Sequence, residues 1–178
     1  MLRTATDLLV EAGPSAVTID AIVARSGVAR STIYRHWESR QDVLLAVIEG
    51  CAPHIDPPEA SLGFDAALRL LMARLAEVLN DPDWARVLPA LFALRNQEHG
   101  IAQLEQRLED RQARVLEQVL DQGVAEGGLD PSVDVDLAES LLVGPLVFAT
   151  LRGRPIDAPL VDHLVDVFLR TSGTASGS

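Results

Sequence analysis

Apolar side chains recur every three or four positions along most of this chain, which is the period of an α-helix with one buried face. In the first fifty residues such stretches are separated by Gly13-Pro14 and by Ser26-Gly27, pairs that end helices and form turns. The pattern predicts four helices there: 2–12, 19–25, 30–37 and about 40–50. The first of them should be short and half-buried, because apolar residues form one face of it and polar residues the other.

Two of these helices carry capping signals at their start. Thr18 precedes the apolar face of 19–25, and a threonine hydroxyl at that place accepts a hydrogen bond from a free backbone N–H. Ser39 is followed three residues later by Asp42, which predicts a capping box with a carboxylate in place of the usual Glu. Both signals support the predicted boundaries.

The second part of the chain begins after a break in the pattern. Residues 51–61 contain three prolines and no period, so they predict a connection. Beyond it, amphipathic segments predict five further helices near 62–80, 83–97, 101–126, 134–151 and 158–171. With aromatic residues at only 4%, the sequence predicts an all-α protein of about nine helices. The expected organisation is a domain at 1–50, the connection at 51–61, a second domain at 62–171 and a disordered tail at 172–178.

The net charge of −11 excludes a protein that coats nucleic acid by overall positive charge. The charge is uneven, however: within 25–40, four arginines face only Glu38. A single cysteine allows no intrachain disulfide, and the apolar run at 141–151 is about half of what a membrane span needs. Since no secretory signal is visible either, a cytoplasmic protein with no membrane partner is expected.

Residues 17–37 contain the three parts of a helix-turn-helix: a helix with an apolar face, a turn with a glycine, and a second helix with two different faces. Ile33 and Trp37, four residues apart, can pack inward with Val28. The polar side chains left on or beside the exposed face are Arg30, Ser31, Thr32, Tyr34, Arg35 and His36. Arginines bond guanine edges or phosphates, and hydroxyl groups reach phosphates, so this face predicts DNA binding.

Two further residues join this predicted DNA-binding set. Thr18 lies at a helix N-terminus, where its hydroxyl and the free N–H groups can hold a phosphate. Arg40, just past the second helix, can contact the flanking DNA backbone.

This segment resembles the tetracycline-repressor (TetR) family of bacterial regulators. The residues that carry the resemblance are Thr18, Ala21-Ile22, Ala24, Ser26-Gly27-Val28, Thr32-Ile33-Tyr34, His36-Trp37, Ser39-Arg40 and Leu44-Leu45. The resemblance implies an all-helical homodimer in which three N-terminal helices bind operator DNA and a fourth links them to a C-terminal body. That body dimerises and holds a small effector. Ala29 departs from the family pattern, in which a serine often caps the recognition helix.

Candidate residues for dimerisation and effector binding lie after residue 70 and are apolar, except for Arg95 and His99, which could supply a polar contact to an effector. Two strongly apolar segments could form a four-helix dimer, or could close the core of the monomer; the residues chosen for the dimer are Leu141, Leu142, Pro145, Leu146, Val161, Leu164, Val165 and Phe168. The candidate pocket for an unknown, largely apolar effector comprises Met72, Trp84, Leu88, Phe92, Arg95, His99 and Phe148. Each of these is also an ordinary core residue.

Other classes of function find less support. An enzyme is not expected, because the chain has no nucleophile elbow, phosphate loop or paired acid motif. No cofactor or metal is expected, since Cys51 and His54 alone make a poor metal site. A helical protein-interaction module that has lost DNA binding stays open as an alternative. The favoured hypothesis is a ligand-responsive, homodimeric, DNA-binding repressor.

Overall fold

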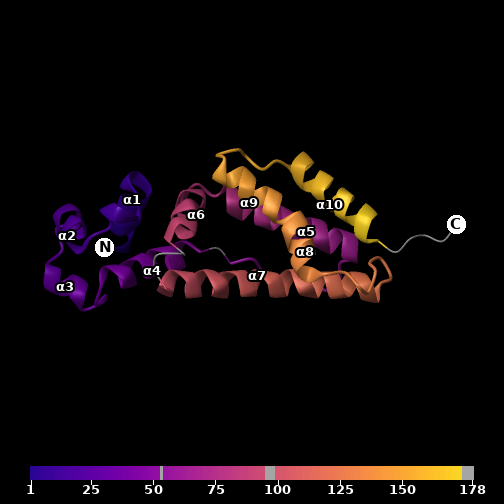
Figure 1. Cartoon of the computed structure of the whole chain (residues 1–178), viewed down its shortest axis with the longest axis horizontal. Helices are drawn as coiled ribbons and strands as arrows, with labels where there is room; N and C mark the ends of the chain where they lie inside the picture. The colour runs from indigo at the N-terminus through magenta and orange to yellow at the C-terminus, as the bar shows by residue number, and fades with distance from the viewer. Residues whose placement is uncertain (53, 95–98, 174–178) are drawn as a thin grey trace. The chain divides into compact units, whose positions relative to one another are not determined.

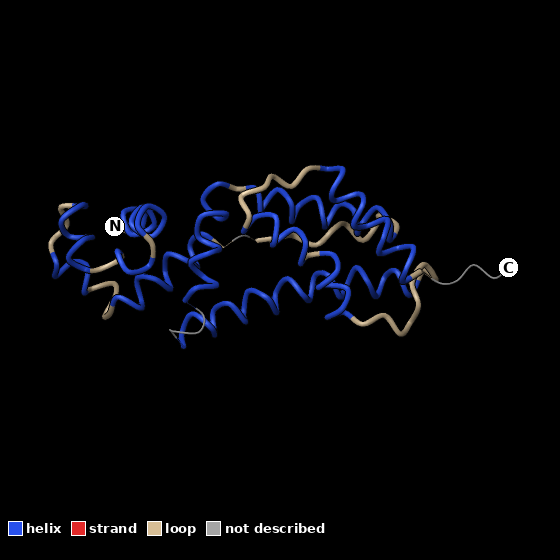
Figure 2. The backbone as a smooth tube through the Cα atoms, turned by 45° about the horizontal axis from the view of Figure 1, so that its top comes forward, coloured by secondary structure: helices blue, strands red, loops and turns tan. Residues whose placement is uncertain are grey.

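The computed structural model describes residues 1–52, 54–94 and 99–173. Within those ranges the chain is helical throughout, with loops between the helices and one isolated antiparallel bridge, from Leu129 to Gly173 (Figure 2). No helix in the described ranges is long and apolar enough to cross a membrane. The all-α prediction is therefore confirmed.

Contacts between residues divide the chain into two compact units. The first comprises Met1–Ala52 with Pro82–Leu108, and the second comprises Pro53–Asp81 with Glu109–Ser178. The helix α7 (His99–Ala125) begins in the first unit and ends in the second. The sequence prediction, with its boundary at 51–61, did not assign Pro82–Leu108 to the first unit. The predicted division of the chain by function stays a prediction.

The first unit begins with the four helices that the sequence predicts (Figure 1). They are α1 (Leu2–Ala12), α2 (Ile19–Ser26), α3 (Arg30–Tyr34) and α4 (Arg40–Cys51), with a short 3-10 turn at Pro14–Ala16. Their fully buried side chains include Ile22, Ile33 and Val43, one from each of α2, α3 and α4. The capping box of Ser39 and Asp42 is present at the start of α4. Helix α6 (Pro82–Leu94) packs on α1 and α4 and completes this core.

The second unit is built from α5 (Phe64–Asn80), the later part of α7, α8 (Val135–Leu142), α9 (Gly144–Leu151) and α10 (Ala158–Ser172). Helix α10 packs along α5, as Figure 1 shows. Two bonds of Arg69 on α5 support this pair, to Asp162 at 3.3 Å and to Asp166 at 2.5 Å on α10. A third bond of Arg69, to Asp65 at 3.2 Å, lies within α5. Asn80 at the end of α5 exchanges two hydrogen bonds with the backbone of Ile156.

In the second unit, one predicted helix is interrupted and the predicted tail begins later than expected. The segment 134–151, expected as one helix, is interrupted at Val143. Pro145 has no backbone N–H to donate to the carbonyl group four residues earlier, which accounts for the break. In the expected tail, Ser172 is part of α10 and Gly173 pairs with Leu129, while 174–178 lie outside the described residues.

Candidate nucleic-acid interface and effector cavity

The turn between α2 and α3 has the geometry that the sequence predicts. Gly27 ends α2 in the left-handed region, with φ of 69°, and its N–H donates to the carbonyl oxygen of Val23 at 2.9 Å. At the other end of α2, the Thr18 hydroxyl oxygen accepts a hydrogen bond from the N–H of Ala21 at 3.1 Å. Ala29 provides no side-chain cap for α3, so this helix begins with free N–H groups.

Helix α3 separates its two faces as expected. Ile33 is fully buried and Trp37 is half-buried, whereas Tyr34 is 46% exposed. The remaining predicted contact residues of this segment lie at the surface: Arg30, Ser31, Arg35 and His36 are exposed and Thr32 is half-buried. The helix ends at Tyr34, three residues earlier than predicted, because the N–H groups of His36 and Trp37 both donate to the carbonyl oxygen of Ile33.

Ion pairs change the electrostatic picture of this surface. Arg25 makes a bidentate bond to Glu11 of α1, at 2.5 and 2.7 Å, and Nη2 of Arg30 pairs with Oδ1 of Asp20. The hydrogen bond from Arg25 holds the pKa of the Glu11 carboxyl below its ordinary value. The basic cluster seen in the sequence is therefore partly neutralised by carboxylates from outside residues 25–40. Arg35 forms no ion pair within the described part of the chain.

Arg40 is occupied inside the first unit. Its Nε donates to the carbonyl oxygen of Val17 at 2.8 Å and its Nη2 donates to that of Pro14 at 2.7 Å. These bonds join the start of α4 to the chain segment that leads into α2. The side chain therefore positions the helix-turn-helix, a role that the sequence did not reveal because the two segments are more than twenty residues apart.

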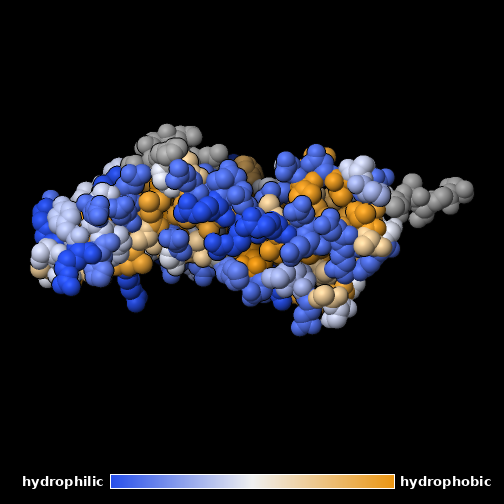
Figure 3. Space-filling view, turned by 90° about the horizontal axis from the view of Figure 1, so that it is seen from below, coloured by the Kyte–Doolittle hydropathy of each residue, from blue (hydrophilic) through white to orange (hydrophobic). Residues whose placement is uncertain are grey.

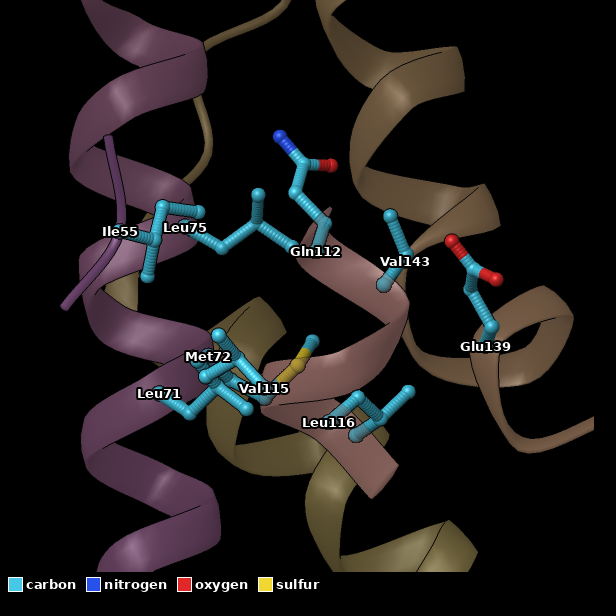
Figure 4. A pocket seen from close by; sticks show the side chains of 9 residues that line it. All are labelled: Ile55, Leu71, Met72, Leu75, Gln112, Val115, Leu116, Glu139 and Val143. Carbon is cyan, nitrogen blue, oxygen red and sulfur yellow. The ribbon is translucent and has the colours of Figure 1, made fainter. Parts of the chain in front are cut away.

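The second unit contains a narrow cavity of about 30 Å³ between α5, α7 and α8. Seven of its nine lining residues are apolar: Ile55, Leu71, Met72, Leu75, Val115, Leu116 and Val143. In Figure 4 the polar ends of Gln112 and Glu139 lie at the outside of this apolar cluster. Since a pocket for a small molecule usually holds about 300–1,000 Å³, the cavity has to widen before it can take a ligand of ordinary size.

Glu139 is the ionisable residue that lines this cavity. Its pKa is raised above the ordinary value, first by burial and then by the nearby carboxylates of Glu109 and Asp136. A carboxyl group in such surroundings favours its neutral, protonated form.

The pocket residues chosen from the sequence do not meet at one place. Met72 lines the cavity, but Trp84 and Leu88 are buried on α6 in the first unit, and Phe92 on the same helix is half-buried. Phe148 is 62% exposed and does not line the cavity. Arg95 lies outside the described residues, as does the side chain of His99 at the start of α7. Apolar periodicity marks all of these as buried but cannot say which buried residues surround a space.

The dimer residues chosen from the sequence are divided between the core and the surface. Five of them are buried within the unit: Leu142, Leu146, Val161, Val165 and Phe168. Pro145 and Leu164 are half-buried, and Leu141 is 47% exposed. Other large apolar side chains of the same helices reach the surface, namely Leu137, Phe148, Leu151 and Val167.

These exposed residues follow a regular spacing on two helical segments. On α8 and α9 the spacing of four, three, four and three residues gives a stripe of Leu137, Leu141, Gly144, Phe148 and Leu151. On α10 a second stripe with similar spacing comprises the half-buried Leu160 and Leu164, the exposed Val167 and one polar residue, Thr171. Figure 3 shows apolar patches among hydrophilic residues near the C-terminal end of the chain. We call these residues the two apolar stripes.

Comparison with known proteins agrees with the fold and the motif. The model of the tetracyclin repressor-like C-terminal domain matches residues 62–168, and the model of bacterial regulatory proteins of the tetR family matches residues 1–47. An uncharacterized HTH-type transcriptional regulator of Mycobacterium bovis is 28% identical over 178 residues, which cover 99% of this chain and 87% of the relative.

Solved structures of other regulators share the fold. A TetR transcriptional regulator of Agrobacterium tumefaciens superposes with a TM-score of 0.70 at 23% identity, covering 97% of this chain and 92% of that one. The fatty acid degradation regulator of Bacillus halodurans gives 0.69 at 19% identity, covering 94% and 95% of the two chains.

The helix-turn-helix and the helical second unit define a DNA-binding protein of the transcription-regulator class. The chain belongs to the TetR family. Its family and its relatives are transcriptional regulators and not enzymes, as the sequence indicated.

Proposed function

We propose that this protein is a homodimeric repressor that binds a specific operator through α3 and releases it when a largely apolar effector occupies the second unit. The observation that carries the proposal is the division of α3. Ile33 holds the helix to the core while Tyr34 and Arg35 extend into solvent. A helix fixed in this way can enter a major groove with its polar side chains forward.

The proposed contact residues differ in their exposure and in the bonds that they already form within the protein. Arg35 and Tyr34 are exposed, so they can reach a base edge or a phosphate without breaking an ion pair within the described residues. Ser31, Thr32 and His36 lie beside them, and Thr18 places the N-terminus of α2 for a phosphate. Arg30 is paired with Asp20 and remains more than half exposed. Arg40 supports the motif through its two backbone bonds.

Dimerisation is proposed to use the two apolar stripes rather than the buried residues of the same helices. Within each helix, apolar residues spaced by four and three form a line along one face, which is the pattern of a helix that packs against another. Two copies of each stripe would make a four-helix interface around a twofold axis. Such a dimer presents two recognition helices to two half-sites on DNA.

The proposed effector site is the cavity beside Met72 and Leu75. Its apolar lining suits an apolar ligand, and its small volume means that a ligand would push α5, α7 and α8 apart. Helix α8 carries Glu139 at the cavity and ends just before Val143, which also lines it, while Leu137 and Leu141 lie on the exposed stripe of α8. Movement of α8 would therefore alter the dimer and the distance between the recognition helices, which lowers operator affinity.

We place the protein in the cytoplasm, where operator DNA and effector meet.

The proposal can be tested with DNA that the wild-type protein selects from a random-sequence library. Tyr34→Ala and Arg35→Ala should each weaken binding to the selected duplex by about 10-fold or more, without a change in helicity or molecular mass. Arg111→Ala, which removes an exposed arginine from α7, is the matched control and should bind as the wild type does. If the library yields no preferred sequence, the chain is instead an interaction module that has lost DNA binding.

A further inference from the structure

Asp20 is an unusual residue for a DNA-binding surface. It is the one acidic residue between Val17 and Trp37, and it lies in the first turn of α2. A carboxylate there repels phosphate, so it weakens DNA binding unless another group compensates. Its carboxylate is paired with the guanidinium of Arg30, the first residue of α3.

The ion pair contributes little to folding. The side chain of Arg30 is 54% exposed and that of Asp20 is 73% exposed. Exposed pairs of this kind stabilise proteins little, so stability alone does not explain a repulsive charge on this surface. What the pair does provide is a direction for the Arg30 side chain, which otherwise has many rotamers.

The pair leaves the guanidinium able to bond DNA. An arginine has five N–H donors, and a guanine accepts two of them at O6 and N7. Asp20 pairs with Nη2 of Arg30, and more than half of the arginine side chain remains accessible. Asp20 and a guanine can therefore hold the same guanidinium from two sides. Such a fixed arginine loses less conformational entropy when it binds, and it tolerates misplaced acceptors less well.

We propose that Asp20 is a positioning residue that aims Arg30 at one guanine of the operator and so sets specificity at that base pair. This inference rests on the proposed function, because it requires α3 to enter the major groove. It predicts different effects of losing the carboxylate on operator DNA and on unrelated DNA. Loss of the carboxylate should weaken discrimination at one base pair of the operator and strengthen binding to unrelated DNA, because one negative charge has left the surface.

The test measures affinities of the wild type and of Asp20→Asn for the duplex selected by the wild-type protein, for each single-base variant of it, and for an unrelated duplex. The wild type should discriminate against replacement of one G·C pair by about 10- to 100-fold. In Asp20→Asn that ratio should fall below about 3-fold, while affinity for the unrelated duplex rises several-fold. Arg30→Ala should lose discrimination at the same base pair, and adding Asp20→Asn to it should change that ratio no further.

Two further variants exclude simpler explanations. Asp20→Glu keeps the carboxylate and should recover part of the discrimination, and Asp121→Asn removes an exposed carboxylate from the second unit and should change no ratio. Equal tightening on operator and unrelated DNA in Asp20→Asn would overturn the inference, because Asp20 would then act by repulsion alone. Wild-type discrimination in Asp20→Asn would overturn it as well. In both cases the proposed function survives, whereas a wild-type protein that selects no sequence ends both proposals.

Discussion

The first residue of α4, Arg40, donates a 2.8 Å hydrogen bond from Nε to the carbonyl oxygen of Val17, just before the capping residue of α2. Together with the bond to the carbonyl oxygen of Pro14, this bond ties the start of α4 to the segment that leads into α2. The residue that the sequence marks as a DNA contact thus has a structural task as well.

Replacement of this side chain should separate the two roles. Arg40→Ala should lower the free energy of unfolding by about 1–2 kcal/mol, because two charge-assisted hydrogen bonds are lost. If the role is structural, the slope of log affinity against log salt should stay as in the wild type. A phosphate contact would instead reduce the slope by about 0.9. Arg3→Ala, at an exposed site on α1, is the control for stability.

Phe148 tests the dimer face. Phe148→Glu places a charge in the middle of the stripe on α8 and α9, so it should give a monomer by light scattering and an operator affinity lower by about 100-fold or more. Arg154→Glu introduces the same side chain at an exposed site outside the stripe and should remain dimeric. A Phe148→Glu protein that stays dimeric would show that the stripe is not the interface.

The cavity can be enlarged beside Leu75. Leu75→Ala and Leu79→Ala remove equal volumes from buried positions one turn apart on α5, but only Leu75 lines the cavity. Both should destabilise the protein by about 2–5 kcal/mol. Only Leu75→Ala should bind the apolar dye N-phenyl-1-naphthylamine more tightly, as measured by saturable fluorescence. Equal dye binding by the two variants would place the ligand elsewhere.

Gly123 tests how closely α7 approaches Phe64 on α5. A Cβ atom at this glycine would lie 2.8 Å from two ring carbons of Phe64 and 2.9 Å from Leu129. Gly123→Ala should therefore destabilise the fold by about 1–2 kcal/mol in urea, because overpacking outweighs the gain in helix propensity. Adding Phe64→Leu should recover part of the loss. A stabilised Gly123→Ala protein would mean that the ring moves aside at little cost.

Glu139 makes the stability depend on pH with a defined sign. Its pKa is raised in the folded state, so both states are protonated at low pH, and the folded state is penalised once pH exceeds the ordinary carboxyl pKa. Glu139→Gln should therefore raise the melting temperature near pH 7, and the gain should shrink as pH falls toward 4.5. Glu117→Gln, at an exposed site on α7, should show no such trend.

The local features of this protein follow from its sequence. Thr18, Gly27 and the pair Ser39 and Asp42 act on backbone groups within a few residues, so their roles can be identified from spacing alone. The same holds for Ile33 inside and Tyr34 outside, since helical period fixes which side chains share a face. These signals predicted the all-α fold and the helix-turn-helix.

Contacts across long separations had to come from the tertiary structure. Glu11 and Asp20 reduce the positive charge of a surface that looks strongly basic in the sequence, because folding brings them beside Arg25 and Arg30. Likewise the apolar helices α8, α9 and α10 have two apolar faces, and the sequence could not say which one the monomer uses. Packing buries Leu142 and Phe168 and leaves Leu137 and Phe148 outside, since a side chain's burial depends on which helices arrive next to it.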